Sequence, residues 1–187
     1  MVLRQLKLID RINILLWGKM DIMEEFIMDD YVNVGRCFSI LHRRSRLFVE
    51  EACQELNLTF SEYSILMRIY SNEGVKQDDL ANMLYLDKAV VTRTINLLQE
   101  KKLIYRQQGQ NDRRVRHIYL TEYGRQQYDF LCSIVKAWVD YLVADMEPEL
   151  VNKLFQGFNA LSERACKADL VKLANKLPIG DAADEKK

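Results

Sequence analysis

Proline and glycine are scarce in this sequence of 187 residues, which contains two prolines and seven glycines. Proline breaks helices and glycine weakens them, so their scarcity favours a mainly helical fold. Hydrophobic residues make up 49% of the chain and charged residues 29%, as is typical of a globular protein with a sizeable core. The length is that of one domain, or of one domain with dimerisation arms.

The sequence also lacks the patterns of common catalytic and metal sites. Its four cysteines show no C-x-x-C spacing and its two histidines, His42 and His117, are far apart, so neither a zinc ribbon nor a disulfide framework is indicated. The motifs G-x-x-x-x-G-K-[ST], G-x-G-x-x-G, H-E-x-x-H and G-x-S-x-G are absent. We therefore predict a protein that is not an enzyme, has no cofactor and holds no metal.

No stretch of the sequence is long and apolar enough to span a bilayer. Near the N-terminus, Asp10 and Arg11 precede the apolar run Ile14–Trp17 and interrupt the apolar core that a secretion signal requires. This favours a cytoplasmic protein. Residues 1–19 have apolar side chains at helical spacing. They form either an arm that packs on a dimer partner or an ordinary amphipathic helix. The remaining alternative is that the sequence starts upstream of the native start.

The most informative stretch is Leu80–Thr121, in which Asp87 is a good N-cap for a helix that begins at Lys88. At about 100° per residue this helix has two faces of different chemistry. One face is apolar and is formed by Val91, Ile95 and Leu98. The opposite face is small and polar and is formed by Ala89, Thr92, Arg93 and Asn96. The first face can bury against a core, and the second has the side chains that read base edges in a DNA major groove.

Two runs rich in β-branched and aromatic residues follow, Leu103–Gln108 and Val115–Thr121, with the polar loop 109–114 between them. They predict a β-hairpin, to which Val75–Lys76 is a candidate third strand. A helix, a turn, a second helix and a basic hairpin together predict a winged helix-turn-helix. Residues 76–121 contain nine Lys or Arg and five Asp or Glu, hence a net charge of +4 in a chain of formal net charge +0. Such positive charge favours contact with a phosphate backbone.

Long amphipathic helices are predicted on both sides of this lobe. Apolar residues recur every three or four positions over 34–56, 128–142 and 150–165. Thr59 and Glu62 form a capping-box pattern at the start of a further helix. Because a small lobe cannot cover two long apolar helix faces near the C-terminus, we expect a homodimer.

The chain from about 34 to 161 resembles the multiple antibiotic resistance regulator (MarR) family of bacterial transcription factors. Asp112–Arg114 followed by Leu120–Gly124 is similar to the family's wing signature and its exit into a long helix, and Asp87–Arg93 is similar to the start of its recognition helix. Lys102 departs from the glycine that is usual after that helix. Since glycine there serves a left-handed C-cap, we expect either a positive φ at Lys102 or a different helix end.

The resemblance implies a mainly α fold with a small β-hairpin, in which a winged helix-turn-helix lobe is joined to long N- and C-terminal dimerisation helices. We expect residues 1–58 to form an N-terminal arm and the first dimerisation and ligand-pocket helix, and 59–121 to form the DNA-binding lobe. The C-terminal dimerisation helices are expected over 122–175, and a disordered tail over 176–187.

We therefore predict a homodimeric DNA-binding transcriptional regulator, a repressor of pseudo-palindromic double-stranded DNA operators that is relieved by a small aromatic anion. The predicted DNA-binding residues are Lys88, Ala89, Thr92, Arg93, Asn96, Asp112, Arg113, Arg114 and Arg116. In this prediction the recognition helix reads bases while Lys88 lies near phosphate. Arg113 and Arg114 reach the minor groove, and Asp112 holds one of the two guanidinium groups in place.

Control by an effector follows from the resemblance alone. The expected ligand residues are Arg43, Arg46, Phe60 and Tyr63, although relatives that bind phenolic ligands often carry tyrosine where this chain has Phe60. Cys37 is near the position at which some peroxide-sensing relatives place a reactive cysteine. The alternatives are therefore a redox- or metal-responsive regulator of the same fold, or a winged-helix module that binds protein and no DNA.

Overall fold

The computed structural model describes residues 28–109, 112 and 114–177. The expected arm at 1–19, Arg113 and nearly all of the expected tail lie outside these residues. The chain divides into two compact units, one formed by residues 35–144 and one by the segments on either side of it.

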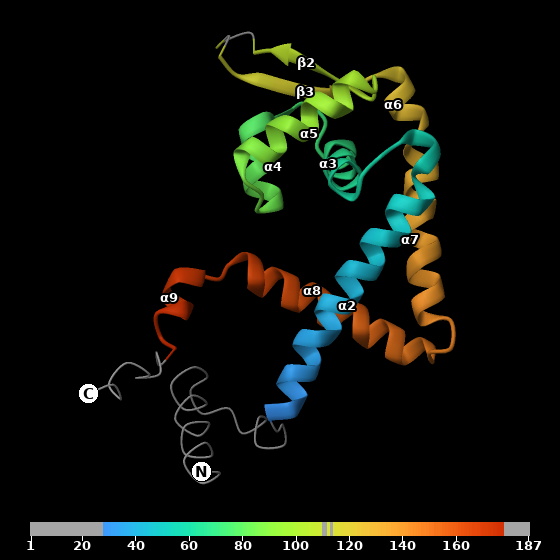
Figure 1. Cartoon of the computed structure of the whole chain (residues 1–187), viewed down its shortest axis with the longest axis vertical. Coiled ribbons are helices and arrows are strands. Elements are labelled where there is room, and N and C mark those ends of the chain that lie inside the picture. The colour runs from blue at the N-terminus through green and yellow to red at the C-terminus, as the bar shows by residue number, and fades with distance from the viewer. Residues whose placement is uncertain (1–27, 110–111, 113, 178–187) are drawn as a thin grey trace, which may run out of the picture. The chain divides into compact units, whose positions relative to one another are not determined.

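The larger unit contains a long helix, a helical lobe with a small sheet, and a second long helix (Figure 1). The elements in chain order are α2 (Met28–Ala52, in this unit from residue 35), the 3-10 turn η1 (Gln54–Leu56), α3 (Phe60–Ser71), β1 (Val75–Lys76), α4 (Gln77–Leu84), α5 (Lys88–Glu100), β2 (Ile104–Gln108), β3 (Arg116–Leu120), α6 (Glu122–Gln126) and α7 (Tyr128–Val143). The predicted fold class is confirmed, although α2 begins before residue 34 and ends before residue 56.

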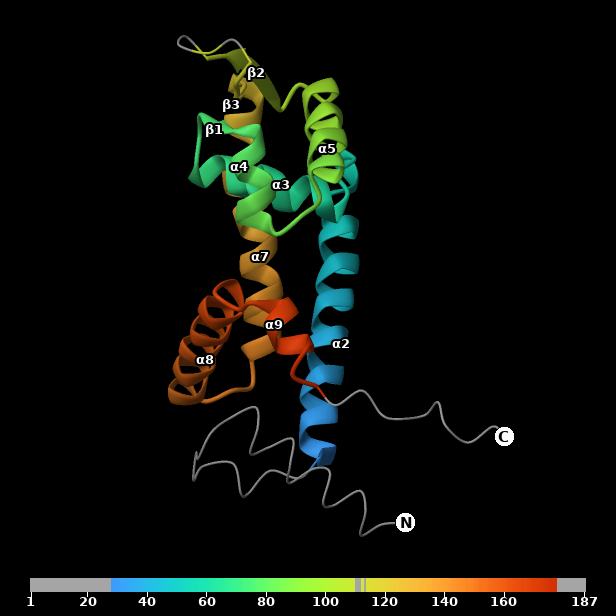
Figure 2. The same cartoon turned by 90° about the vertical axis from the view of Figure 1, so that its left-hand side faces the viewer.

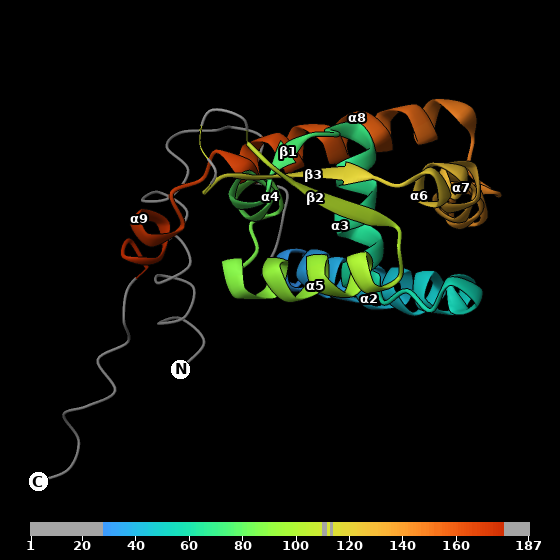
Figure 3. The ribbon, with the colours of Figure 1, turned by 90° about the horizontal axis from the view of Figure 1, so that it is seen from above.

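The three strands form one antiparallel sheet in the order β1-β3-β2. The register places Val75 opposite Ile118 on one side of β3, and Arg106 opposite Ile118 on the other. The predicted hairpin and its third strand are thus confirmed. The sheet lies over α3 and α4, with α5 along one side (Figures 2 and 3).

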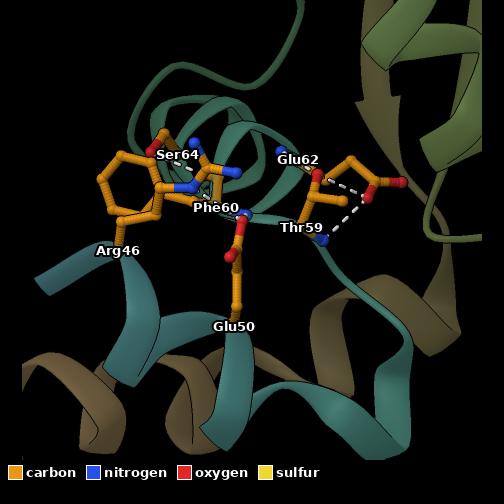
Figure 4. Close-up of polar contacts among 6 residues, drawn as sticks. All are labelled: Arg46, Glu50, Thr59, Phe60, Glu62 and Ser64. Carbon is orange, nitrogen blue, oxygen red and sulfur yellow. Dashed lines mark hydrogen bonds and ion pairs between the residues drawn. The ribbon is translucent and has the colours of Figure 1, made fainter. Parts of the chain in front are cut away.

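The first turn of α3 is fixed by the predicted capping box. The Thr59 hydroxyl accepts from the backbone N–H of Glu62 at 3.3 Å, and the Glu62 carboxylate accepts from the backbone N–H of Thr59 at 2.8 Å (Figure 4). Glu62 is buried, and its second carboxylate oxygen binds the Lys101 ammonium at 2.5 Å. Lys101 also donates to the backbone carbonyl of Asn57. The end of α5 is thereby joined to the start of α3.

The turns at the two ends of α5 use left-handed backbone conformations. Tyr85 has φ 53° between α4 and α5, and Lys102 has φ 58° directly after the C-cap of α5. A non-glycine residue at positive φ is strained. Of the two outcomes expected at Lys102, the positive φ is therefore the one found, and the hydrogen bonds of Lys101 help to hold this turn.

The helix expected to run on from Thr121 is divided into α6 and α7. Thr121 caps α6 by accepting from the N–H of Gly124 at 2.9 Å. A Cβ atom on Gly124 would lie 2.0 Å from the carbonyl oxygen of Leu103, so glycine is required at this close approach. The Tyr70 hydroxyl donates to the Gly124 carbonyl, and this bond ties α3 to α6.

Aromatic packing joins α2 to α7 within the larger unit. The rings of Phe48 and Trp138 stack at a centroid distance of 5.2 Å, and the indole N–H of Trp138 donates to the Ser45 hydroxyl at 2.8 Å. These contacts lie next to the buried core, to which Val49 of α2 and Leu131 of α7 belong. The lobe and the two helices therefore share one core.

The smaller unit is exposed and apolar on much of its surface. It contains α8 (Pro148–Cys166) and α9 (Leu170–Ala174), and Pro148 occupies the first turn of α8 as predicted. None of the α8 residues is buried within the described chain. Across the described residues, no helix has both the length and the apolar character needed to cross a membrane.

Candidate nucleic-acid interface

Helix α5 presents the two faces that the sequence predicts. Val91, Ile95 and Leu98 are buried in the core. The side chains on the other face are exposed, and they are Lys88, Ala89, Thr92, Arg93 and Asn96. Small, amide and guanidinium groups thus share one solvent-facing strip of the helix.

The first turn of α5 is fixed by Asp87 and adjoins the first turn of α4. The Asp87 carboxylate accepts from the N–H of Ala89 at 2.7 Å and caps the helix. Lys88 extends toward Asp78, with 3.4 Å between the ammonium and the carboxylate. Both side chains of this pair are exposed, so the pair contributes little stability and leaves Lys88 available to a phosphate.

A polar network lies against the middle of α5 and is centred on Arg106 of β2. The guanidinium donates to three amide oxygens: Nε to Gln77 at 3.3 Å, Nη1 to Gln99 at 2.9 Å and Nη2 to Asn96 at 2.5 Å. The amide nitrogen of Gln77 in turn donates to the Thr92 hydroxyl at 2.9 Å. Three segments of the lobe, β1–α4, α5 and β2, are thereby joined beside the exposed face of α5.

Arg106 reaches this position because of strand alternation. Side chains two residues apart lie on the same face of a strand, and Ile104 on that face is buried in the core. Burial, followed by repulsion from Arg116, lowers the pKa of Arg106 below its ordinary 12.5. A hollow of ≈ 260 Å³ beside the network is lined by Asn96, Gln99, Glu100 and Arg106.

Gln77, Gln99 and Arg106 belong to no motif in the sequence that would predict a role for them. Gln77 and Arg106 are 29 positions apart, and no local pattern relates them. The alternation of β2 was the available signal, since it places a charged residue on the face of Ile104. Which groups accept hydrogen bonds from that charged side chain depends on the packing of α4 and α5 against the sheet.

In the wing, Asp112 makes a hydrogen bond to the loop backbone. The Asp112 carboxylate accepts from the backbone N–H of Arg114 at 2.8 Å, as is common for Asp in a turn. Within the described part of the wing, no ion pair joins the side chains of Asp112 and Arg114. Asp112 thus orders the loop backbone of the wing. Arg113 lies outside the described residues.

Basic side chains surround a second hollow between the wing and the start of α4. This hollow of ≈ 500 Å³ is lined by Lys76, Gln77, Asp78, Arg114, Val115 and Arg116. Arg114 and Arg116 are exposed. The chemistry of the lining suits a phosphate group, because three cations face one carboxylate.

The residues expected to bind an effector do not all share one surface. Arg43 and Arg46 are exposed on α2, and Arg46 binds Glu50 at 3.1 Å. Glu50 also accepts from the backbone N–H of Phe60 at 3.3 Å, as Figure 4 shows. Tyr63, by contrast, is buried, and its hydroxyl donates to the Leu131 carbonyl at 3.0 Å. Burial raises the pKa of Tyr63 to about 12, and its side chain belongs to the core.

The cysteines of the larger unit differ in exposure. Cys37 is exposed on α2, whereas Cys53 is buried. Burial raises the pKa of the Cys53 thiol to about 11, which disfavours the reactive thiolate. In the described ranges, no group of three or more His, Cys, Asp or Glu residues is arranged to hold a metal ion.

Comparison with known proteins gives the same family as the sequence motifs. The MarR family model matches residues 58–115. The helix-turn-helix-type transcriptional regulator YybA of Bacillus subtilis is 31% identical over 78 residues, which are 42% of this chain and 52% of YybA. The chain therefore spans about half the length of that relative.

Solved structures share the fold over most of their length. The crystal structure of MarR is 31% identical, with a TM-score of 0.65 over 72% of this chain and 98% of MarR. A MarR family regulator from Listeria monocytogenes, solved in complex with 26mer DNA, is 23% identical and has a TM-score of 0.66 over 70% of this chain and 87% of its own. An identity of 31% over nearly all of MarR, on the same fold, shows that this chain belongs to the MarR family of winged helix-turn-helix transcriptional regulators.

Proposed function

We propose that this regulator is a homodimeric repressor whose two α5 helices enter successive major grooves of a pseudo-palindromic operator. The half-sites would lie about one helical turn apart, roughly 34–36 Å. The observation that carries the proposal is the exposed strip of α5, formed by Ala89, Thr92, Arg93 and Asn96 beside the basic wing. The structure of the Listeria relative supports it, because that protein has this fold and was solved in complex with 26mer DNA.

In this proposal the side chains divide into base readers and phosphate contacts. Arg93, which is exposed at the centre of the strip, is suited to a guanine edge. Lys88 and Arg116, which are both exposed, bind the DNA backbone. Arg114 and Arg113 enter the minor groove, and Asp112 acts through the loop backbone that it orders.

The partner of the smaller unit is a second copy of the chain. Helix α8 exposes large apolar side chains at Leu150, Phe155, Phe158 and Leu161. Such a face is covered in a stable oligomer. In this proposal residues 59–121 bind DNA, and residues 122–175 form the dimer together with the first long helix.

Release from the operator is assigned to a small aromatic anion near Arg43, Arg46 and Phe60. Both guanidinium groups are exposed, and the half-buried ring of Phe60 packs edge-on against His42 at a centroid distance of 5.7 Å; both observations support this location. Tyr63 is left out because its side chain is buried. A ligand changes DNA affinity only by its different affinity for the two conformations, so the site must change when the half-site spacing changes.

The test is to select DNA fragments of the source genome that bind the purified protein, and then to titrate one of them. We expect a two-fold symmetric sequence and one dimer per site. Salicylate-like anions should lower operator affinity, and the effect should disappear in Arg43→Ala. Binding without sequence preference would reject the operator model. Unchanged affinity with the anion, but a change after peroxide treatment that Cys37→Ser abolishes, would replace the anion by oxidation.

A further inference from the structure

We propose that Arg106 sets the sequence preference of this regulator without touching DNA, by making Asn96 a hydrogen-bond donor toward the bases. The inference rests on the proposed DNA-binding role of α5. It concerns one position of each half-site, at which Asn96 would favour a base edge that accepts hydrogen bonds, guanine above all, over adenine.

The first step is that the guanidinium fixes the orientation of the amides around it. Arginine has only donors, so an amide that binds it must turn its oxygen inward. This applies to Asn96 at 2.5 Å and to Gln99 at 2.9 Å. It also applies to Gln77, whose nitrogen is separately fixed by the Thr92 hydroxyl at 2.9 Å. Chemistry, and not only the placement of atoms, therefore determines which end of each amide is inward.

The second step is the pattern that remains on the exposed strip. With its oxygen bound to Arg106, Asn96 presents its NH₂ group outward. The Thr92 hydroxyl donates to the Lys88 carbonyl at 2.8 Å and accepts from Gln77, so its hydrogen is not available to a base. Next to Arg106 the strip thus presents a donor at Asn96 and a methyl group at Thr92.

The third step relates this pattern to DNA. A free asparagine reads adenine through two bonds, with its oxygen accepting from N6 and its nitrogen donating to N7. Arg106 takes one of the two lone pairs of that oxygen and turns the oxygen inward, which disfavours the bidentate contact. Guanine offers acceptors at both N7 and O6, and both suit an NH₂ group. The network therefore converts a residue suited to adenine into one that favours guanine.

Arg106 is suited to this role by its position. Its side chain is partly buried against the lobe, and its guanidinium group already donates to three amide oxygens. Arg116 lies near enough to lower its pKa but is itself exposed. Removing Arg106 should therefore change base preference, whereas removing Arg116 should change phosphate binding.

The experiment is in vitro selection of operator sequences with the full-length wild type and Arg106→Met, followed by titration of matched guanine and adenine operators. Removing the donor releases the Asn96 oxygen, so the guanine-to-adenine affinity ratio at one position per half-site should fall by ~2–10-fold. Other positions should keep their preferences. The slope of log affinity against log salt should stay the same, because Arg106 does not neutralise a phosphate.

Arg116→Met is the matched control. It should make the salt slope shallower by about one and leave the base ratio unchanged. In an Asn96→Ala background, Arg106→Met should have no further effect on the ratio, which separates positioning from a general loss of structure. If the Met variant is unstable, Arg106→Lys keeps the charge but replaces the planar fork of donors by a single ammonium group, and it should shift the ratio in the same direction.

Three results would overturn the inference. An unchanged ratio would show that Asn96 reads DNA independently of Arg106. A shallower salt slope in Arg106→Met would show that Arg106 binds phosphate itself. Equal loss of affinity on all sequences, with a lowered Tm, would make Arg106 a structural residue only. If even the wild type prefers no DNA fragment, the proposed operator function is rejected, and this inference is rejected with it.

Discussion

At the scale of single residues, the exposed strip of α5 combines one side chain that is free to turn with others that are held. Asn96 and Thr92 are bound to neighbours from other segments, whereas Arg93 is exposed at the centre of the strip. A long, unrestrained side chain can adapt to different bases. A side chain held by its neighbours discriminates against bases that its fixed donors and acceptors cannot bind. Arg93 should therefore supply affinity through a base contact, and Asn96 should supply selectivity.

Arg93→Ala should weaken binding to the operator by about 1–3 kcal/mol and binding to random DNA by much less, because a base contact is lost. Fluorescence anisotropy titrations on both duplexes measure the difference. Lys88→Ala is the control, with an expected equal loss on both. Equal losses for Arg93→Ala would place this guanidinium on phosphate.

Glu62 is the buried charge of the lobe, and its effect depends on pH. Burial opposes its ionisation, but the hydrogen bonds from Lys101 and Thr59 outweigh burial, so its pKa lies below the ordinary 4.5. The ionised carboxylate therefore stabilises the fold at pH values above about 4.5, and this contribution is lost as the pH falls through the folded-state pKa.

Glu62→Gln should lower the free energy of unfolding by about 1.5–3 kcal/mol near neutral pH, because charged hydrogen bonds are lost. Below pH 4 the difference from the wild type should shrink. Urea unfolding at several pH values measures both. A difference that stays constant over the whole range would mean that the charge of Glu62 does not stabilise the fold.

At the scale of elements, the wing combines an ordered turn with exposed charge. Arg114→Ala should weaken binding equally on operator and random DNA and make the salt slope shallower by about one. Its Tm should stay the same, since an exposed arginine adds little stability. Titrations at several salt concentrations give the slope. Unchanged affinity and slope would show that the hairpin does not contact DNA.

The junction between the sheet and α6 has no space for a side chain at Gly124. Gly124→Ala should destabilise the protein strongly, by more than about 3 kcal/mol, since its Cβ would collide with backbone at 2.0 Å. Gly35→Ala in α2 is the matched control, because nothing lies within 4 Å of its Cβ position. It should stabilise the helix by roughly 0.5–1 kcal/mol. Thermal unfolding compares the two, and similar Tm values would contradict the close approach.

At the scale of the whole molecule, the apolar face of α8 is exposed within the part of the chain that the structure describes. The double variant Phe158→Glu and Leu161→Glu should shift the protein from dimer to monomer at micromolar concentration and remove tight operator binding. Sedimentation velocity gives the oligomeric state. Lys153→Glu, on the same helix, should remain dimeric. A double variant that remains a dimer with full operator affinity would reject α8 as part of the dimer interface.

The sequence alone determined the lobe and its outer face. Asp87, the capping box at Thr59 and the spacing of Val91, Ile95 and Leu98 are local signals, because caps and helical periodicity involve residues within one or two turns. The hairpin was equally local, and its pairing followed from two short alternating runs. The wing motif and the helix-turn-helix together were specific enough to indicate the MarR family.

Only the tertiary structure decided how the polar groups of that face are used. The fold of the loop places the Asp112 carboxylate where it accepts from the backbone N–H of Arg114. Tyr63 was placed in the core, while Arg106 met three amides from two other segments. Such hydrogen bonds join groups far apart in sequence, and they form only after the sheet has packed against α4 and α5. The physical reason is that local sequence sets which groups face outward, whereas packing sets which of their donors and acceptors remain free.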